Sequence, residues 1–358
     1  MKLQKKVIFE NIIINGINLN NRVMVSPMCQ YSANNGKPSK WHYNHLSKLI
    51  KTGAGSIIVE STAVSKVGRI STKDLCLYNS SQMKAHKKLI NHLKKIQNVP
   101  IILQISHSGR KGSSEIPWIS SNTPLKGKKS WKTISASSIK RDEGWPVPKK
   151  ANKSEIKKII SQFISTANLA FNCGYDGVEV HIAHGYLLHQ FFSPISNQRK
   201  DDYGGNLKKR TRIILEIFKG LSKIKKNKKI FGARITGKDH LERGLQEKDC
   251  VYLINKLTKL KLDYACISSG GIIPITKLKF KKGFRVNFSS KIKSKTKVLI
   301  SSTGQIYPKK YIKNILEKGK LDLVAVGRRF ISNPNWLSNK FRMQGKYKII
   351  PKQYLRCY

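Results

Sequence analysis

Acidic residues are scarce in this chain. Its 358 residues include 19 Asp and Glu against 70 Lys and Arg, which leaves a formal net charge of +51. A field of that size attracts polyanions, so nucleic acid is a candidate partner. However, 56 of the basic residues are lysine, spread along the chain, and only 14 are arginine, the residue suited to bidentate recognition of bases and phosphates. Abundant Lys, Ile and Asn are also what AT-rich codons encode, so we expect no specific nucleic-acid partner.

Cysteines are few and long apolar runs are absent. The six cysteines, at positions 29, 76, 173, 250, 266 and 357, are never closer than 16 positions, which excludes Cys-x-x-Cys zinc sites, local iron–sulfur motifs and a disulfide framework. No segment has the roughly 18 consecutive apolar residues that a membrane helix needs. The apolar run at 12–14 is too short for a signal peptide. We therefore expect reduced thiols, a cytoplasmic location and no membrane association.

Eight short segments have the apolar, β-branched composition of buried strands. They are 23–28, 55–61, 100–105, 175–181, 230–235, 264–268, 297–302 and 322–326. Most are continuous apolar runs, which is typical of parallel strands covered on both faces. Helical patterns alternate with them, near 82–97, 153–172, 207–225, 246–261 and 308–318. Eight strand–helix units predict a single (β/α)8 TIM barrel in one domain, 1–358, with a doubly wound sheet as the alternative.

Two connections refine this prediction. The segment 107–152, rich in Ser, Gly, Pro and Lys, is too long for an ordinary connection, so we expect a long excursion after strand three, over the catalytic face. The helix at 153–172 is preceded by Asn152, with Glu155 three positions on, which is the spacing of a capping box.

The fourth predicted strand runs into His181, His184 and Tyr186. In a barrel the functional side chains lie at the carboxyl ends of the strands, and both histidines reach one site only if the chain turns after His181. No third metal ligand lies nearby in the sequence and no Gly-x-Ser-x-Gly motif is present, which disfavours a metal site and a hydrolase. The pattern favours two imidazoles that donate to an oxygen gaining negative charge, with a tyrosine as proton donor. The alternative is a pair of core histidines.

The later strands indicate an anionic ligand. Arg234 interrupts an apolar strand, where an unpaired guanidinium is costly, so we expect an anionic partner for it. Gly304 follows strand seven, and Gly327 and Arg328 follow strand eight, the places where barrels often bind phosphate through backbone N–H groups. Together these residues predict a phosphate-bearing cofactor across the mouth of the barrel.

Three blocks of sequence, VMVSPMCQYS, HIAHGYLLHQFFSPISNQRKDDYGGN and VGRRFISNP, carry a resemblance to a known family. Through them the chain resembles, over essentially its whole length, the Old Yellow Enzyme family of NAD(P)H:flavin oxidoreductases and ene-reductases. It is most similar to the NADPH dehydrogenase-like branch with a cysteine on the first strand. The resemblance implies a TIM barrel that binds FMN non-covalently and is reduced by NADPH or NADH. It also implies hydride transfer from flavin N5 to the β carbon of α,β-unsaturated carbonyl or nitro compounds. The alternatives are a different FMN-dependent barrel dehydrogenase and a basic polyanion-binding protein.

The resemblance also implies a role for individual residues. His181 and His184 would bind the substrate oxygen, helped by Tyr31, and Tyr186 would protonate the α carbon. The implied flavin contacts are Ser26, Pro27, Met28, Cys29, Ser61, Gln104, Arg234, Gly304, Gly327 and Arg328. Gln104 would lie at the pyrimidine edge, Arg234 near flavin N1, and the last three at the ribityl phosphate. Ser61 departs from the family, which often has alanine there. No metal site is implied.

The tail Gln353-Tyr354-Leu355-Arg356 is similar to one in the cysteine-bearing branch that crosses a dimer interface and places its arginine in the neighbour's active site. Tyr and Arg are enriched where interfaces bury their centres. We expect a homodimer or homotetramer in which Arg356 acts across the interface on a small-molecule alkene substrate. The chain ends soon after the eighth strand and has no cysteine cluster, so we expect no appended iron–sulfur or second flavin domain.

Overall fold

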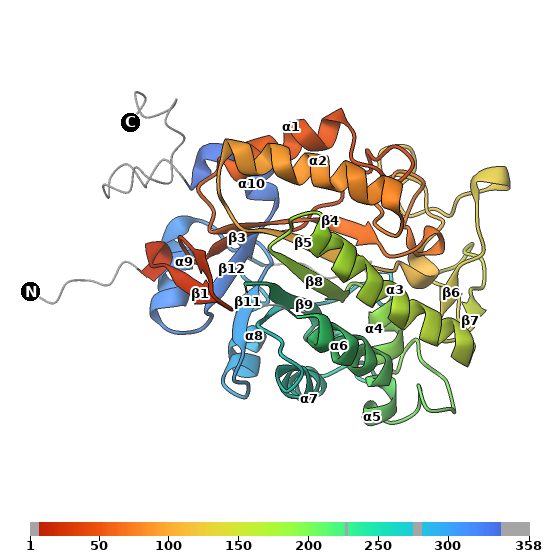
Figure 1. Cartoon of the computed structure of the whole chain (residues 1–358). Coiled ribbons are helices and arrows are strands. Elements are labelled where there is room, and N and C mark those ends of the chain that lie inside the picture. Colours follow the sequence, from red (N-terminus) through yellow and green to blue (C-terminus); the bar gives the residue numbers. More distant parts are fainter. Residues whose placement is uncertain (1–6, 226–227, 275–280, 338–358) are drawn as a thin grey trace, which may run out of the picture.

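The computed structural model describes residues 7–225, 228–274 and 281–337. Eight parallel strands close into a barrel in the order β10-β11-β12-β3-β4-β5-β8-β9 (Figure 1). They are β3 (Val23–Val25), β4 (Ser56–Ala63), β5 (Ile101–Ser106), β8 (Gly177–Ile182), β9 (Ile230–Thr236), β10 (Tyr264–Ser268), β11 (Leu299–Ser302) and β12 (Leu323–Val326). The predicted (β/α)8 barrel is confirmed, and a doubly wound sheet is excluded.

The strand predictions differ from the observed bounds by at most two residues, with one exception. The first strand ends at Val25, although the prediction extended it to residue 28. Pro27 explains this early end, because a proline has no N–H to donate to a sheet. The shorter strand leaves Ser26, Pro27 and Met28 in an irregular segment at the mouth of the barrel.

Helices surround the barrel (Figure 1). They are α1 (Lys40–Ile50), α2 (Ser80–Ile96), α3 (Lys153–Asn172), α4 (Leu187–Phe192), α5 (Leu207–Arg210), α6 (Arg212–Ile224), α7 (Glu247–Thr258), α8 (Val286–Lys293), α9 (Lys309–Glu317) and α10 (Arg328–Ser332). The helix predicted at 207–225 is two helices, separated at Thr211. The Thr211 hydroxyl donates to the carbonyls of Leu207 and Lys208 at 3.0 and 3.1 Å, and such bonds compete with the regular helical pattern. Helices α1, α4, α8 and α10 were not predicted.

The capping box of α3 is confirmed. The Glu155 N–H donates to Asn152 Oδ1 at 2.8 Å, and the Asn152 N–H donates to Glu155 Oε2 at 2.9 Å. These bonds satisfy two backbone donors that have no partner within the helix. Capping fixes the start of α3 after the long excursion, and the buried Phe163 packs the helix against the barrel.

A hairpin covers the opposite end of the barrel and was not predicted. It consists of β1 (Ile12–Ile14) and β2 (Ile17–Leu19), joined by Asn15 and Gly16, whose φ values are +46° and +76°. An Asn-Gly pair with both φ positive is the preferred two-residue hairpin turn, so the sequence did contain the signal. Ile14 and Leu19 pack against the apolar side chains that fill the bottom of the barrel. This end is therefore closed.

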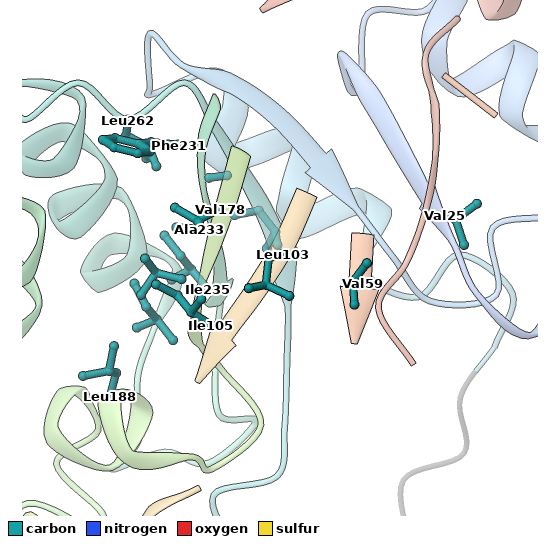
Figure 2. Close-up of a cluster of buried hydrophobic side chains, with 14 of the residues drawn as sticks. Val25, Val59, Leu103, Ile105, Val178, Leu188, Phe231, Ala233, Ile235 and Leu262 are labelled. Carbon is teal, nitrogen blue, oxygen red and sulfur yellow. The ribbon is translucent and has the colours of Figure 1, made fainter. Parts of the chain in front are cut away.

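Alternate residues of each strand face the barrel interior. Figure 2 shows outward-facing side chains of β5, β8 and β9, among them Leu103, Ile105, Val178, Ala233 and Ile235, which pack together in the core between strands and helices. Since side chains alternate along a strand, the intervening residues point inward. The register pairs Gln104 with Glu179, Glu179 with Gly232, and His181 with Arg234. Polar side chains thus gather inside the barrel toward its carboxyl end.

The excursion between β5 and α3 lies at this same end. In Figure 1 it is the yellow segment toward which the barrel strands point. Arg110 ties it to α4 and to the loop after β10. Its backbone N–H donates to Gln190 Oε1 at 3.2 Å, and its guanidinium donates to the Ile272 carbonyl at 2.6 Å. The prediction that 107–152 is a long excursion over the catalytic face is consistent with this position. The prediction of one domain over 1–358 stays a prediction.

Candidate active site

A cavity of about 580 Å³ opens at the carboxyl ends of the strands. Eight predicted site residues line it: Ser26, Pro27, Met28, His184, Arg234, Gly304, Gly327 and Arg328. It is completed by residues that the sequence analysis did not single out: Arg285, Thr303, Gln305, Ile306, Tyr307, Ala325, Val326, Arg329 and Ser332. Cavities of about 300 to 1,000 Å³ hold small molecules and cofactors. The other predicted residues that the structure describes do not line it: Cys29, Tyr31, Ser61, Gln104, His181 and Tyr186.

The histidine pair is formed by a turn directly after β8. His181 Nε2 and His184 Nδ1 are 3.3 Å apart. His181 Nδ1 accepts from the Ala183 N–H at 3.3 Å, so its proton is on Nε2. His184 Nε2 lies 2.6 Å from the Ser268 hydroxyl at the end of β10. Burial, and next the charge of Arg234, lower the pKa of both imidazoles well below its usual value, so both are neutral N–H donors at pH 7.

Tyr186 packs edge-on against His181, with 4.9 Å between ring centroids. The Lys111 ammonium lies 5.1 Å from the centroid of the Tyr186 ring and donates to the His184 carbonyl at 2.8 Å. Burial and the repulsion of nearby arginines lower the pKa of Lys111 to about 7. Burial raises the pKa of Tyr186 and of Tyr31, so both phenols are protonated. Tyr31 is held at φ +46° and contacts the ring of Trp118 edge-on.

Arg234 lies on β9, one position across from His181, and is 8% exposed. Its Nε is buried and has no hydrogen-bond partner among the described residues. Beneath it, Glu179 accepts from Gln104 Nε2 at 2.7 Å and from the Tyr264 hydroxyl at 2.8 Å. Gln104 is thus buried in this interior network and does not line the cavity. An unsatisfied guanidinium N–H at the wall of a cavity indicates that a ligand acceptor belongs there.

Cys29 follows the segment from Ser26 to Met28 and is half-buried. Burial, and then the nearby Glu60, raise the pKa of its thiol well above the usual value, against the opposing effect of the Ser61 main chain. Glu60 is itself held next to this loop, because its Oε2 accepts from the Gln30 N–H at 2.9 Å. The thiol is therefore protonated at neutral pH and lacks the reactivity of a thiolate. Ser61 is buried behind it.

The far end of the cavity is basic and has close backbone approaches. Gly304 has a φ of +122°, and a Cβ there would lie 3.0 Å from Phe284. A Cβ at Gly327 would lie 3.1 Å from the sulfur of Met28. Three arginines surround this end, Arg285, Arg328 and Arg329, and none forms an ion pair with an acidic residue in the described part of the chain. Such a cluster suits a phosphate.

Arg285 is the main residue that the sequence analysis missed. Its Nε donates to the Ser269 hydroxyl at 3.0 Å, and its Nη2 donates to the Ser269 carbonyl at 3.1 Å. Burial, and then the charge of Arg234, lower its pKa to about 10. The signal in the sequence was composition: Arg285 is one of few arginines in a chain where lysine supplies most positive charge.

Three further predictions concern Arg356, metal ligands and membrane-spanning helices. Arg356 lies outside the described residues. Nowhere in residues 7–225, 228–274 and 281–337 do three His, Cys, Asp or Glu side chains converge as metal ligands would. None of the helices in these ranges combines the length and the hydrophobicity of a bilayer-spanning segment.

Known proteins are similar to this chain over most of its length. The model of the NADH:flavin oxidoreductase / NADH oxidase family matches residues 7–344. An NADH:flavin oxidoreductase of Gibberella zeae is 36% identical over 346 residues, 91% of this chain and 83% of that protein. An NADPH dehydrogenase of Clostridium acetobutylicum is 33% identical over 355 residues, 98% of this chain and 99% of that protein. The solved structure of a 2-naphthoyl-CoA reductase has the same fold, with a TM-score of 0.85 at 20% identity; it covers 95% of this chain, which spans 52% of that longer protein.

The family model matches residues 7–344, and the alignment with the Clostridium acetobutylicum protein covers 98% of this chain and 99% of that protein. The chain therefore belongs to the NADH:flavin oxidoreductase family, the Old Yellow Enzyme family, and is an FMN-dependent NAD(P)H oxidoreductase.

Proposed function

We propose that this oxidoreductase is an ene-reductase, which reduces α,β-unsaturated carbonyl or nitro compounds by hydride addition at the β carbon. The single observation that carries the proposal is the pair of neutral imidazoles, His181 and His184, side by side at the mouth of the barrel with Tyr186 against them. When bound, FMN supplies the hydride. The chain itself must bind the substrate oxygen, hold the alkene in place and deliver a proton.

Two donors that converge on one oxygen polarise the double bond conjugated to it. His181 carries its proton on Nε2, facing His184. In the structure the His181 Nε2–H donates to His184 Nδ1, which leaves the His184 proton on Nε2, toward the Ser268 hydroxyl. A substrate oxygen that enters between the rings would take the His181 N–H, and the Ser268 hydroxyl could then donate to His184 Nε2 so that the Nδ1–H of His184 faces the same oxygen. Donors held in place by the surrounding protein stabilise the charge that develops on the oxygen. The Tyr31 hydroxyl would be a third donor to the same oxygen.

Tyr186 is the group we assign to protonate the α carbon. Its raised pKa keeps the proton on the phenol at neutral pH, and its ring is fixed by His181 on one side and by Lys111 on another. General acids of this type contribute about 10²- to 10⁴-fold to a rate. Lys111 lies over the same ring and donates to the His184 carbonyl, so it links the phenol to the histidine turn.

The residues around the cavity fit FMN. Arg234 Nε and the Ser26 hydroxyl are buried at its wall and without a hydrogen-bond partner among the described residues, which suits the polar edge of an isoalloxazine. A positive charge at this edge stabilises an anionic reduced flavin. Gly304, Gly327 and the arginines beside them would hold the phosphate. Gln104 would act on the pyrimidine edge together with Glu179, which it contacts, and Cys29 and Ser61 would lie against the ring.

The test begins with purified protein. We expect a yellow protein that releases FMN on denaturation, is reduced anaerobically by NADPH or NADH, and then reduces cyclohexenone, a maleimide or a nitroalkene. In the double variant His181→Ala/His184→Ala, FMN should stay bound and nicotinamide oxidation by oxygen should continue. Alkene reduction should fall by at least about 10²-fold, the usual effect of losing a transition-state donor. Cyclohexenone reduction at the parent rate in that variant would contradict the proposal.

We also propose a homo-oligomer in which Arg356 acts across the interface. The support is the sequence motif alone, two tyrosines around an arginine at 354–358. Deleting 354–358 should leave folded, FMN-bound protein of lower oligomeric state with weaker substrate binding. A parent protein that is monomeric by light scattering would exclude this arrangement.

A further inference from the structure

The turn that pairs the two histidines is conformationally demanding. His184 has a φ of +58° and Gly185 a φ of +71°. The first value places a side-chain-bearing residue in the left-handed region, which persists only where the surroundings enforce it. A Cβ on Gly185 would overlap the carbonyl oxygen of Gly271, so the turn also lies against the loop after β10. Without this turn, residues three apart on a strand face opposite ways and the two imidazoles separate.

Both polar groups of Gly185 are bonded by the next helix, α4. The Gly185 N–H donates to His189 Nδ1 at 2.8 Å. The Gly185 carbonyl accepts from Gln190 Nε2 at 2.6 Å. Because a backbone N–H can only donate, His189 Nδ1 must be unprotonated, and the proton of this imidazole is on Nε2. One tautomer of His189 is therefore compatible with the turn, and the other would set two N–H groups against each other.

That tautomer is fixed by Asp239, in the segment after β9. His189 Nε2 donates to Asp239 Oδ1 at 2.9 Å, and both side chains are completely buried. Asp239 Oδ2 also accepts from the Ser193 hydroxyl at 2.7 Å and from the Leu245 N–H at 2.9 Å. Three donors to a buried carboxylate keep it ionised, and an ionised carboxylate can only accept. Asp239 thus requires the proton on His189 Nε2.

We propose that Asp239 and His189 are positioning residues for substrate binding: they hold the turn at Gly185 in the conformation that directs His181 and His184 toward one oxygen. The inference rests on the proposed function, because it concerns the same substrate oxygen. Neither residue lines the cavity. The effect passes through one backbone hydrogen bond, so the state of a carboxylate in the segment after β9 determines the geometry of the substrate-binding turn after β8.

The substitution Asp239→Asn tests the direction of this dependence. The amide can donate to His189 Nε2, which shifts the imidazole proton to Nδ1 and turns it against the Gly185 N–H. Substitutions at His189 separate its contact with the Gly185 N–H from its contact with Asp239. The amide oxygen of asparagine takes the place of Nδ1, and the amide nitrogen of glutamine takes the place of Nε2. His189→Asn keeps an acceptor for Gly185, whereas His189→Gln keeps only the donor to Asp239.

Three quantities are measured: the Kd of the phenol para-hydroxybenzaldehyde, the Kd of FMN, and Tm. The phenol is the probe because its oxygen would take the place of the substrate oxygen between His181 and His184. Its binding to the holoenzyme is followed by the change in flavin absorbance. Loss of a group that orients a metal ligand commonly costs about 10- to 100-fold in affinity, and we expect a loss of the same order in phenol affinity in Asp239→Asn and His189→Gln. His189→Asn should bind the phenol more tightly than His189→Gln. The Kd of FMN should change less than about threefold in all three, because the turn is not part of the phosphate end.

The matched control is His86→Gln. His86 is also completely buried and bonded through its ring, to the Tyr175 hydroxyl at 2.8 Å, but it lies on α2 outside the barrel. It should lower Tm without changing phenol affinity. If the variants at 189 and 239 alter phenol affinity no more than His86→Gln at a similar loss of Tm, the inference is overturned. If Asp239→Asn does not fold, the comparison of His189→Asn with His189→Gln still tests the inference, and an equal phenol Kd in these two variants overturns it. A parent enzyme that binds no phenol and reduces no enone would instead refute the proposed function.

Discussion

The substitution Gly185→Ala measures how tightly the histidine turn is built. Two costs follow from the structure. A left-handed φ of +71° is unfavourable for alanine by about 1–2 kcal/mol. The new methyl group would overlap the Gly271 carbonyl oxygen and lie 2.7 Å from its carbon, so a backbone segment must move, and such overpacking costs about 1–3 kcal/mol. The total, about 2–5 kcal/mol, is a large part of the stability of a typical domain.

Gly205→Ala is the control for the first cost alone. Gly205 has a φ of +86°, but nothing lies within 4 Å of a Cβ built there. It should lower the free energy of unfolding by about 1–2 kcal/mol in urea titrations, and leave ligand binding intact. Gly185→Ala should be less stable than this control, and should lose phenol affinity because the His184 backbone moves with the turn. Equal stability of the two variants would refute the close packing of Gly185 against Gly271. An unchanged phenol Kd in Gly185→Ala would refute the link between this turn and the position of His184.

Three other perturbations have definite expected outcomes. Tyr186→Phe should slow alkene reduction by about 10²-fold or more, while reduction of the flavin by NAD(P)H keeps its rate, because only alkene reduction needs a proton for carbon. Equal slowing of both half-reactions in stopped flow would exclude this role. Cys29→Ala should shift the flavin midpoint potential and retain activity, since the thiol is protonated and has no neighbouring base; complete inactivation with flavin still bound would contradict this. Burial lowers the pKa of His107 to about 3. Between pH 6.5 and 3 the unfolded chain therefore binds a proton at this histidine that the folded chain does not bind. As the pH falls through this range, His107 lowers the free energy of unfolding by about 1.4 kcal/mol per pH unit. A His107→Asn variant should show a shallower loss of urea midpoint between pH 7 and 5, and an unchanged slope would argue against a buried neutral imidazole.

Much of the barrel could be predicted because its determinants are local. Continuous apolar runs of strand length identified all eight strands, and Asn152 with Glu155 identified the start of α3. The inward direction of Arg234 also follows from local pattern, because its neighbours Ala233 and Ile235 are apolar and pack outward. Where a prediction was wrong, a single side chain decided it: Pro27 ended the first strand, and Thr211 divided a helix.

Other parts of the site depend on contacts between loops, which leave no periodic signal. Arg285 lies in a connecting segment, and only the fold brings it beside Arg234. Ser268 ends β10 as an ordinary small residue, yet its hydroxyl reaches His184 from a strand 84 positions away. His189 lies in one of the three sequence blocks that resemble the family, but its partner Asp239 follows the next barrel strand, β9. Neither spacing nor composition could have paired them.

These loop contacts converge on one short segment. Asp239 acts on the Gly185 N–H through His189, and the excursion holds the Gly185 carbonyl through Gln190, whose amide oxygen also accepts from the Arg110 N–H at 3.2 Å. Lys111 bonds the His184 carbonyl from the same excursion. The turn after β8 is therefore held from the β9 side and from the β5 side at once. The segment after β9 and the excursion are far apart in sequence but act on the same peptide groups. Conservative changes in either of them should weaken binding of the substrate oxygen before they affect the phosphate end, where residues that follow β11 and the end of β12 form the wall.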